Sequence, residues 1–411
     1  MNREPRPVST FENELAAELE GIRAAGLYRE LRRVDSIHGT RLEIAGRRLL
    51  SFCSNDYLGL AGHPALREAA ARAALDFGAG AGASRLVSGS LAAHHELEET
   101  LAEFKATAAA LVFSTGYATA LGTIAALVGK EDVLLTDKLV HACVVDAARL
   151  SGARLRIFHH NDVEDLEAKL KWAAALPRVA CASGRAAPRI LIVTESVFSM
   201  DGDLAPLREI IELKDKYGAW LMLDEAHATG LFGEHRRGLA EAQELAERVE
   251  IQMGTLGKAL GVAGGYICGA RPLIDLLINR ARSFLFSTAP VPAAAAAATA
   301  AVRLVQSSEG ESRRQQLWQN VDAAKNAVIH AGWTLPAIQS AILPMMIGEE
   351  EAAVAIAAEL RAGGLFIPAI RYPTVAHGRA RLRLTLSAAH AETDVLELGR
   401  ALATVKQPSA S

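Results

Sequence analysis

Hydrophobic and polar positions change their spacing along the chain and so mark successive elements. Near the N-terminus, apolar residues at helical spacing predict an amphipathic helix over residues 11–34, and a strand pair follows at residues 40–44 and 48–52. From residue 63 to about residue 288, short apolar runs alternate with helical stretches. Such strands, apolar throughout and separated by helices, predict a largely parallel sheet. The clearest of them lie at residues 110–113, 133–135, 154–158, 190–193 and 220–223.

The pattern changes after an alanine-rich run at residues 289–305. This run contains two prolines and is marginal in length for a membrane span, so we expect a buried helix. Beyond it, helices and strands form a second, smaller α+β unit. Its helices are predicted at residues 313–331 and 350–362, and its strands at residues 342–347, 365–368 and 381–386.

These patterns predict an α/β protein with three parts. An N-terminal helix and strand segment spans residues 1–62. A large α/β domain with a mostly parallel sheet flanked by helices spans residues 63–290. A smaller C-terminal α+β domain spans residues 291–411.

Composition excludes several classes of function. The net charge is −3, with 44 basic and 47 acidic residues interspersed, so we expect no binding to nucleic acid or to an anionic membrane. The four cysteines are far apart and form no CxxC pair, which argues against a metal site and against a disulfide framework. The charged N-terminus has no apolar stretch of the signal-peptide type. We therefore expect a soluble cytoplasmic protein.

Polar side chains follow three of the predicted strands, at the edge where open α/β sheets bind ligands. Asp224 ends one strand, Ser199 follows another in the run SMDGD, and Gly116 follows a third in the run STGY. A strand, then STG, then a helix places free backbone N–H groups where a phosphate can bind. Each feature has a simpler explanation, since aspartate caps helices, such runs form turns, and similar tripeptides open helices that bind nothing.

The sharpest feature is Lys258 in the run GTLGKALG, residues 254–261. A lysine among small and apolar residues loses hydration, which lowers its pKa as a Schiff-base lysine requires. Glycine-lysine pairs also occur in ordinary loops. Together with Asp224, Gly116, Thr255 and a stacking side chain, however, Lys258 supplies every part that pyridoxal 5'-phosphate (PLP) needs. His141 follows a predicted strand and is the candidate for stacking, although a lone histidine is more often structural.

The sequence resembles the α-oxoamine synthases of the fold-type I PLP-dependent transferases. The resemblance rests on the runs SNDYLGL, SMDGD, DEAHATG and GTLGK, which occur in the family's order, and it extends from about residue 15 to residue 395. Near the C-terminus, the runs AIRYPTV and ARLRLTLSAAH also match. Members with these C-terminal runs often have a second proline where Tyr372 stands, so this chain departs from the pattern at that position.

By position, the resemblance implies a role for each residue at the cofactor. Lys258 is implied to hold the cofactor as a Schiff base and to act as the catalytic base. Asp224 is implied to pair with the pyridine nitrogen, and His141 to stack on the ring and lie beside the substrate. His227 and Ser199 are implied to bind the oxygen O3' of the ring.

The phosphate of the cofactor is implied to contact Gly116, Tyr117 and Thr255. The resemblance also implies that Thr288 reaches the phosphate of a partner subunit, because active sites in this family form at a dimer interface. We therefore expect a homodimer with shared active sites.

Substrate contacts are implied for five further residues. Asn55 and Arg383 would bind the carboxylate of the amino acid, while Arg29, Arg371 and Thr374 would lie on the acyl-donor side. For Arg383 there is independent support, because its strand alternates Arg and Thr with Leu and so has a polar face. A guanidinium suits bidentate carboxylate binding, but each of these arginines could instead be a solvated surface charge.

The resemblance implies a decarboxylating condensation of L-alanine with a pimeloyl thioester of coenzyme A or an acyl carrier protein, as in biotin biosynthesis. An alternative within the family is a glycine C-acetyltransferase, which condenses glycine with acetyl-CoA. An NAD-dependent dehydrogenase is the alternative from another class, suggested by the glycine run GAGAG at residues 78–82. That run follows a helical stretch and not a strand, as the dinucleotide fingerprint requires. No GxSxG run of a hydrolase is present.

Overall fold

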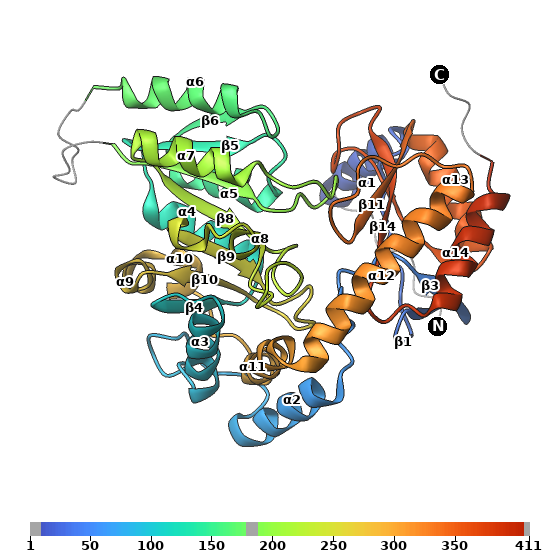
Figure 1. Cartoon of the computed structure of the whole chain (residues 1–411), viewed down its shortest axis with the longest axis horizontal. Helices are drawn as coiled ribbons and strands as arrows, with labels where there is room; N and C mark the ends of the chain where they lie inside the picture. The colour runs from blue at the N-terminus through green and yellow to red at the C-terminus, as the bar shows by residue number, and fades with distance from the viewer. Residues whose placement is uncertain (1–9, 178–187, 407–411) are drawn as a thin grey trace.

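A seven-stranded sheet forms the centre of the larger lobe of the protein (Figure 1). The computed structural model describes residues 10–177 and 188–406. Six strands of this sheet run in one direction, and only β10 is antiparallel to its neighbours, so the predicted mostly parallel sheet is confirmed. Across the sheet the order is β4 (Ala109–Phe113), β10 (Gly265–Gly269), β9 (Ile251–Thr255), β8 (Trp220–Asp224), β7 (Ile190–Glu195), β5 (Val133–Asp137) and β6 (Arg154–Phe158).

Helices cover both faces of this sheet. Side chains of a strand alternate between the two faces, so Leu134 packs in one apolar cluster whereas Val133 and Leu135 pack in the other. Both faces are thus buried along the inner strands, which explains why these strands contain few polar residues, whereas the edge strand β6 exposes Arg154 and Arg156. Leu134 shares its cluster with α4 (Gly116–Leu127), α5 (Ala142–Ser151), α9 (Arg271–Arg280) and α10 (Arg282–Leu285). Helices α6 (Val163–Ala174), α7 (Leu207–Tyr217), α8 (Leu239–Ala242) and the short 3-10 turn Ala246–Arg248 border the other cluster.

The alanine-rich run forms α11 (Pro292–Gln306), which packs against α2 (Pro64–Phe77) and α3 (Ala92–Phe104). Ala298 and Ala301 are fully buried there, because small side chains allow the helices to approach closely. The predicted buried helix is therefore confirmed. Among the helices that the structure describes, none has the length and apolar character needed to cross a membrane.

Two small sheets form the second lobe, in which N-terminal strands lie among C-terminal elements (Figure 1). Strand β12 pairs in parallel with β3, so the two ends of the chain share one sheet. The four-stranded sheet has the order β1 (Ser36–His38), β2 (Arg41–Ile44), β3 (Arg47–Ser51) and β12 (Leu365–Phe366). The antiparallel three-stranded sheet has the order β11 (Ile342–Gly348), β14 (Ala380–Thr385) and β13 (Ala369–Ile370). The helices of this lobe are α1 (Thr10–Ala24), α12 (Ser308–His330), α13 (Glu350–Ala362) and α14 (Glu392–Thr404).

The N-terminal helix is shorter than predicted, because it ends in a Schellman motif. Gly26 adopts a left-handed conformation, with φ of +67°. Its N–H donates to Arg23 O at 2.9 Å, and the N–H of Leu27 donates to Ile22 O, also at 2.9 Å. These bonds satisfy the last carbonyls of the helix and turn the chain away. The predicted continuation of the helix to residue 34 is therefore wrong.

Strands β9 and β10 lie within the sheet but are not among the strands predicted from the sequence. Each of these short strands contains glycine, which weakens the apolar pattern that marks the other strands. The pairing itself explains one of these glycines. Tyr266 of β10 lies opposite Gly254 of β9, and a Cβ atom on Gly254 would lie 2.3 Å from the tyrosine ring. Strand β9 therefore needs glycine where a buried strand normally has an apolar side chain.

Candidate active site

Polar residues from several strand ends converge on one cavity at the carboxyl edge of the large sheet. Glu195 ends β7, Asp224 ends β8 and Thr255 ends β9. This is the edge at which parallel α/β sheets bind ligands. The cavity has a volume of about 200 Å³. It is lined by Gly116, Tyr117, His141, Cys143, Glu195, Ser199, Asp224, Ala226, His227, Met253, Thr255 and Lys258.

Lys258 is half-buried in the loop after β9, and its amine points into this cavity. The Nζ atom lies 2.8 Å from Nε2 of His227. Burial lowers the pKa of Lys258, while the nearby carboxyl groups of Asp224 and Glu195 partly oppose that shift. A lysine with a lowered pKa is uncharged for a larger fraction of the time, which makes it a better nucleophile and base. The desolvated setting predicted from the sequence is therefore present.

Two buried carboxyl groups, Asp224 and Glu195, face the same cavity. Burial raises the pKa of Asp224, and the positive charge of Lys258 lowers it in part. Burial and the neighbouring Asp224 together raise the pKa of Glu195 to about 8. The Asp224 carboxylate is fixed in place because it accepts the N–H of Ala226 at 2.9 Å. This arrangement favours a cationic group in the cavity, since a positive charge would stabilise both ionised carboxylates.

His141 caps the N-terminus of α5 and borders the cavity. Its Nδ1 accepts the N–H of Cys143 at 3.2 Å, which satisfies one free donor of the helix. Its own backbone N–H donates to the Glu195 carboxylate at 2.6 Å. Burial lowers the pKa of the His141 imidazole, so the ring is neutral at pH 7. A neutral planar ring held by its backbone at the cavity wall is suited to stacking on an aromatic ligand.

A chain of hydrogen bonds joins Lys258 to Arg383 of β14. With Lys258 donating to Nε2 of His227, the imidazole Nδ1–H donates to the Tyr57 hydroxyl at 2.7 Å. The Tyr57 O–H then donates to Oδ1 of Asn55 at 3.3 Å, and Arg383 donates to the same oxygen at 3.2 Å. Burial and the charge of Lys258 hold the pKa of His227 well below its ordinary value, which fits a neutral ring in this chain. The predicted residues Asn55 and Arg383 thus lie beside the cavity and are linked to its lysine.

The opposite end of the cavity contains the N-terminus of α4. Thr115 caps this helix, and its hydroxyl accepts the N–H of Ala118 at 3.0 Å. Gly116 lies against Gly265 of β10, where a Cβ atom on Gly265 would lie 2.7 Å from the Gly116 Cα. This close approach brings the first N–H groups of α4 next to Thr255 of β9. Free N–H groups and a hydroxyl at a helix N-terminus form a suitable phosphate site.

The residues of this cavity fit PLP. The cofactor needs an amine for its aldehyde, an acid beside its pyridine nitrogen, a stacking ring and a phosphate site. Lys258, Asp224, His141 and the Gly116–Thr255 end of the cavity have these properties, and Glu195 adds a second buried acid. Eight of the nine residues that the sequence predicts for the cofactor and its chemistry line this one cavity, namely Gly116, Tyr117, His141, Ser199, Asp224, His227, Thr255 and Lys258.

Thr288 is the ninth of these residues, and it lies elsewhere. It is exposed and forms an isolated antiparallel bridge with Ser84. In this single chain, therefore, Thr288 does not line the cavity that contains Lys258.

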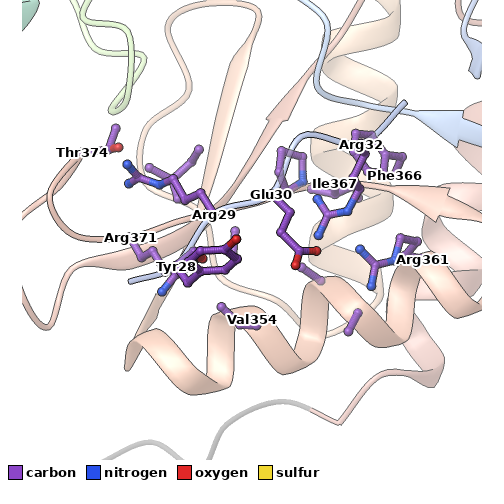
Figure 2. Close-up of a pocket in the computed structure, with 15 residues that line it drawn as sticks. Tyr28, Arg29, Glu30, Arg32, Val354, Arg361, Phe366, Ile367, Arg371 and Thr374 are labelled. Carbon is purple, nitrogen blue, oxygen red and sulfur yellow. Dashed lines mark hydrogen bonds between the residues drawn. The ribbon is translucent and has the colours of Figure 1, made fainter. Parts of the chain in front are cut away.

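Arg29, Arg371 and Thr374 line a second cavity of about 370 Å³, between the N-terminal segment and α13 (Figure 2). Arg371 donates to the carbonyl of Gly26 and, at 3.1 Å, to the carbonyl of Tyr28. This second cavity shares no lining residue with the Lys258 cavity. The structure thus groups the three residues predicted for the acyl donor, but apart from the cofactor residues.

Glu195 and Tyr57 make hydrogen bonds that build this site, although neither was predicted as a site residue. Glu195 holds the backbone of His141, and Tyr57 connects His227 to Asn55. For Glu195 the signal was present, because an acidic residue at the end of a buried strand is unusual. Tyr57 could have been found only from the fold, since its hydroxyl meets His227 from a distant part of the chain.

The chain is similar to several known proteins. The model of the family "Aminotransferase class I and II" matches residues 47–402. An 8-amino-7-oxononanoate synthase from Geobacter sulfurreducens is 47% identical, over 95% of this chain and 97% of that protein. A synthase of the same name from Anaeromyxobacter dehalogenans is also 47% identical, over 95% of both chains. Among solved structures, serine palmitoyltransferase from S. paucimobilis with bound PLP–myriocin aldimine is 30% identical, with a TM-score of 0.88 over 97% of this chain and 98% of that one.

The raised pKa of Glu195 predicts how stability depends on pH in the cofactor-free protein. Between about pH 4.5 and pH 8, folded Glu195 keeps a proton that the unfolded chain releases, so stability falls as the pH rises through this range. The Glu195→Gln variant should lose this part of the slope, which is at most about 1.4 kcal/mol per pH unit. Urea unfolding at several pH values measures it. Glu164→Gln, on the exposed side of α6, is the control, and equal slopes in wild type and Glu195→Gln would contradict the prediction.

Proposed function

Because the chain belongs to the aminotransferase class I and II family, we propose that it is an 8-amino-7-oxononanoate synthase of biotin biosynthesis. Such an enzyme uses PLP to condense L-alanine with a pimeloyl thioester and releases carbon dioxide. The observation that carries the proposal is the 47% identity to a synthase of this name over 95% of the chain. The cavity around Lys258 supports it, because its side chains fit PLP.

PLP, when bound, supplies an electron sink that stabilises a negative charge at the α-carbon of the amino acid. Lys258 is the proposed attachment point and the base that removes the α-proton of alanine, since its lowered pKa favours a free amine. Asp224 is proposed to hold a proton on the pyridine nitrogen. Its buried carboxylate gains most from a neighbouring positive charge. His141 is proposed to stack on the ring, and its place at the start of α5 keeps it there.

Arg383 and Asn55 are proposed to bind the carboxylate of alanine. Arg383 is buried in β14, and its Nε donates to Ser199 O at 2.6 Å, which fixes the direction of the guanidinium. A fixed guanidinium binds a carboxylate with little loss of side-chain entropy. His227 and Ser199 are proposed to lie beside O3' of the cofactor ring.

The second cavity is proposed to receive the far end of the acyl donor. A pimeloyl chain ends in a carboxylate, which needs a cationic or hydrogen-bonding partner when it is buried. Arg29 and Arg371 supply positive charge in that cavity, and Thr374 supplies a hydroxyl (Figure 2). The proposal covers both coenzyme A and an acyl carrier protein as the carrier. We also propose that the enzyme acts in the cytoplasm.

We also propose that the enzyme is a homodimer in which Thr288 serves the cofactor phosphate of the other subunit. Phe286 and Val291 flank Thr288 in sequence, and these residues are 72% and 46% exposed in the single chain. Large apolar side chains that are exposed together are typical of a surface that another protein covers.

Replacing Lys258 by alanine should abolish activity and the visible absorbance of bound PLP, because no other residue that lines this cavity is a lysine. The fold should persist, which circular dichroism can verify. Lys171→Ala, whose side chain is 62% exposed on α6, should change neither property. Borohydride reduction of the wild type followed by peptide mapping must label Lys258, and a label on another lysine would refute the assignment.

Substrate choice tests the proposed activity directly. Product formation should be measured with alanine, glycine and serine against pimeloyl, acetyl, succinyl and palmitoyl thioesters. We expect the pimeloyl donor to be preferred clearly, and alanine to be preferred over glycine only modestly, because one methyl group contributes about 1–3 kcal/mol. Preference for acetyl-CoA with glycine, or for palmitoyl-CoA with serine, would assign the enzyme to another activity of the α-oxoamine synthases.

In the same assay, Arg29→Ala and Arg371→Ala should raise KM for the pimeloyl donor by roughly 10- to 100-fold, because each removes a charged hydrogen-bond donor. Binding of alanine, read from the absorbance of bound PLP, should change little. Arg33→Ala is the control, since its side chain is 89% exposed and pairs with Asp35 outside the cavity.

The dimer is tested by sedimentation and by complementation. Lys258→Ala and a Thr288→Ala variant with impaired activity should recover part of the activity when mixed, because a mixed dimer has one intact site. A fully active monomer at assay concentration would refute the shared site.

A further inference from the structure

Two walls of the Lys258 cavity come from segments that are not adjacent in sequence. One wall contains His141, which is reached from Asp137 at the end of β5. The other contains Ser199, which lies in the SMDGD loop, residues 199–203, after β7. The spacing of these walls must suit a planar ring, so a contact that joins the two segments bears directly on the cavity.

His160 makes that contact from the turn after β6. Its Nδ1 lies 3.0 Å from Oδ1 of Asp137, and its Nε2 lies 2.7 Å from Oδ2 of Asp203. Burial lowers the pKa of this imidazole, but the hydrogen bonds to the two carboxylates outweigh burial and raise the pKa to about 10. His160 is therefore a cation at pH 7 that donates to both carboxylates at once. Charge-assisted hydrogen bonds of this kind are about twice as strong as neutral ones.

Neighbouring hydrogen bonds connect this bridge to the wall of the cavity. The Asp137 carboxylate also accepts the N–H of Leu139 at 2.7 Å and the N–H of Asn161 at 2.9 Å, so it fixes the turn that leads to His141. Asn161 repeats the bridge, because its side-chain amide donates to Oδ2 of Asp203 at 3.0 Å. The rings of His160 and Phe198 also pack in a T-shaped arrangement, with ring centroids 4.4 Å apart.

The SMDGD loop is held from its other side by β14. Arg383 donates to Ser199 O at 2.6 Å, and Arg381 donates to the Asp201 carboxylate at 2.7 Å. The loop is thus fixed between two cationic groups of β14 and the cation of His160. Without His160, the guanidinium contacts would remain, but Asp203 would be joined to the turn before His141 through the uncharged Asn161 and no longer through a cation.

We propose that His160 is a positioning residue that sets the distance between the His141 and Ser199 walls of the cofactor cavity. This inference rests on the proposed function, because it concerns the binding of PLP in that cavity. His160 itself lines no part of the cavity and acts only through Asp137 and Asp203.

The test uses the full-length protein and titrates PLP into its cofactor-free form. His160→Gln keeps the polarity of the side chain but cannot donate to two carboxylates as a cation. It should weaken PLP binding and lower kcat, each by on the order of 10-fold, since small misplacements of a site are costly. KM for the acyl donor should stay near the wild-type value, because the donor contacts lie elsewhere. The absorbance maximum of bound PLP should also shift.

A rescue variant separates positioning from general stability. In His160→Gln with Asp203→Asn, the glutamine oxygen can accept from the asparagine amide, so PLP affinity should recover in part. Losses that simply add in the double variant would overturn the proposal. His159→Gln is the matched control, because the neighbouring imidazole is 72% exposed and contacts Asp165 on the surface.

Further outcomes are decisive in the same experiment. If His160→Gln binds PLP and turns over like the wild type, the proposal fails although the proposed function stands. If wild-type protein binds no PLP, the proposed function fails first. Should His160→Gln not fold, Asp203→Asn alone removes the negative charge from one half of the bridge with an isosteric side chain. Unchanged PLP affinity and an unchanged spectrum in that variant would overturn the inference.

Discussion

The buried guanidinium of Arg383 is the contact on which the rest of the site depends, because it joins three separately built sheets. Arg383 belongs to β14 of the three-stranded sheet and donates to Ser199, which follows β7 of the large sheet. It also donates to Asn55, which follows β3 of the four-stranded sheet. Arg383 is only 6% exposed, and these two oxygens accept hydrogen bonds from its Nε and Nη1. The same contacts that stabilise the buried charge therefore bring both lobes to the cavity edge.

Charge balance in the cavity follows from a similar constraint. Lys258 is one potential cation beside two buried carboxyl groups, and burial disfavours the ionised form of all three. The carboxyl groups of Asp224 and Glu195 hold protons to unusually high pH as a result. A cofactor with a protonated ring nitrogen would relieve this cost by stabilising the ionised carboxylates. The site therefore favours a ligand that brings a positive charge. Neutral His141 and His227 add no competing positive charge.

Much of this arrangement could be predicted from the sequence, because parallel strands bring their carboxyl ends to one edge. Asp224 could be found on that basis and Lys258 from its small and apolar neighbours in sequence, and the two do share a cavity. Other contacts arise only when distant segments meet. His160 reads as an ordinary turn residue until β5 and the SMDGD loop are placed on either side of it. The spacing of apolar residues likewise continued the first helix beyond Ala24, since it gives no weight to the left-handed turn at Gly26.

The parallel pairing of β3 with β12 has a consequence for synthesis on the ribosome. Leu50 pairs with Leu365, so the four-stranded sheet closes only when almost the whole chain has emerged. The seven-stranded sheet ends at Gly269 and is complete in sequence much earlier. During translation, the edge of β3 would therefore remain unpaired while the large sheet forms. A nascent chain of this protein should therefore need protection at its N-terminal strands and not at its catalytic sheet.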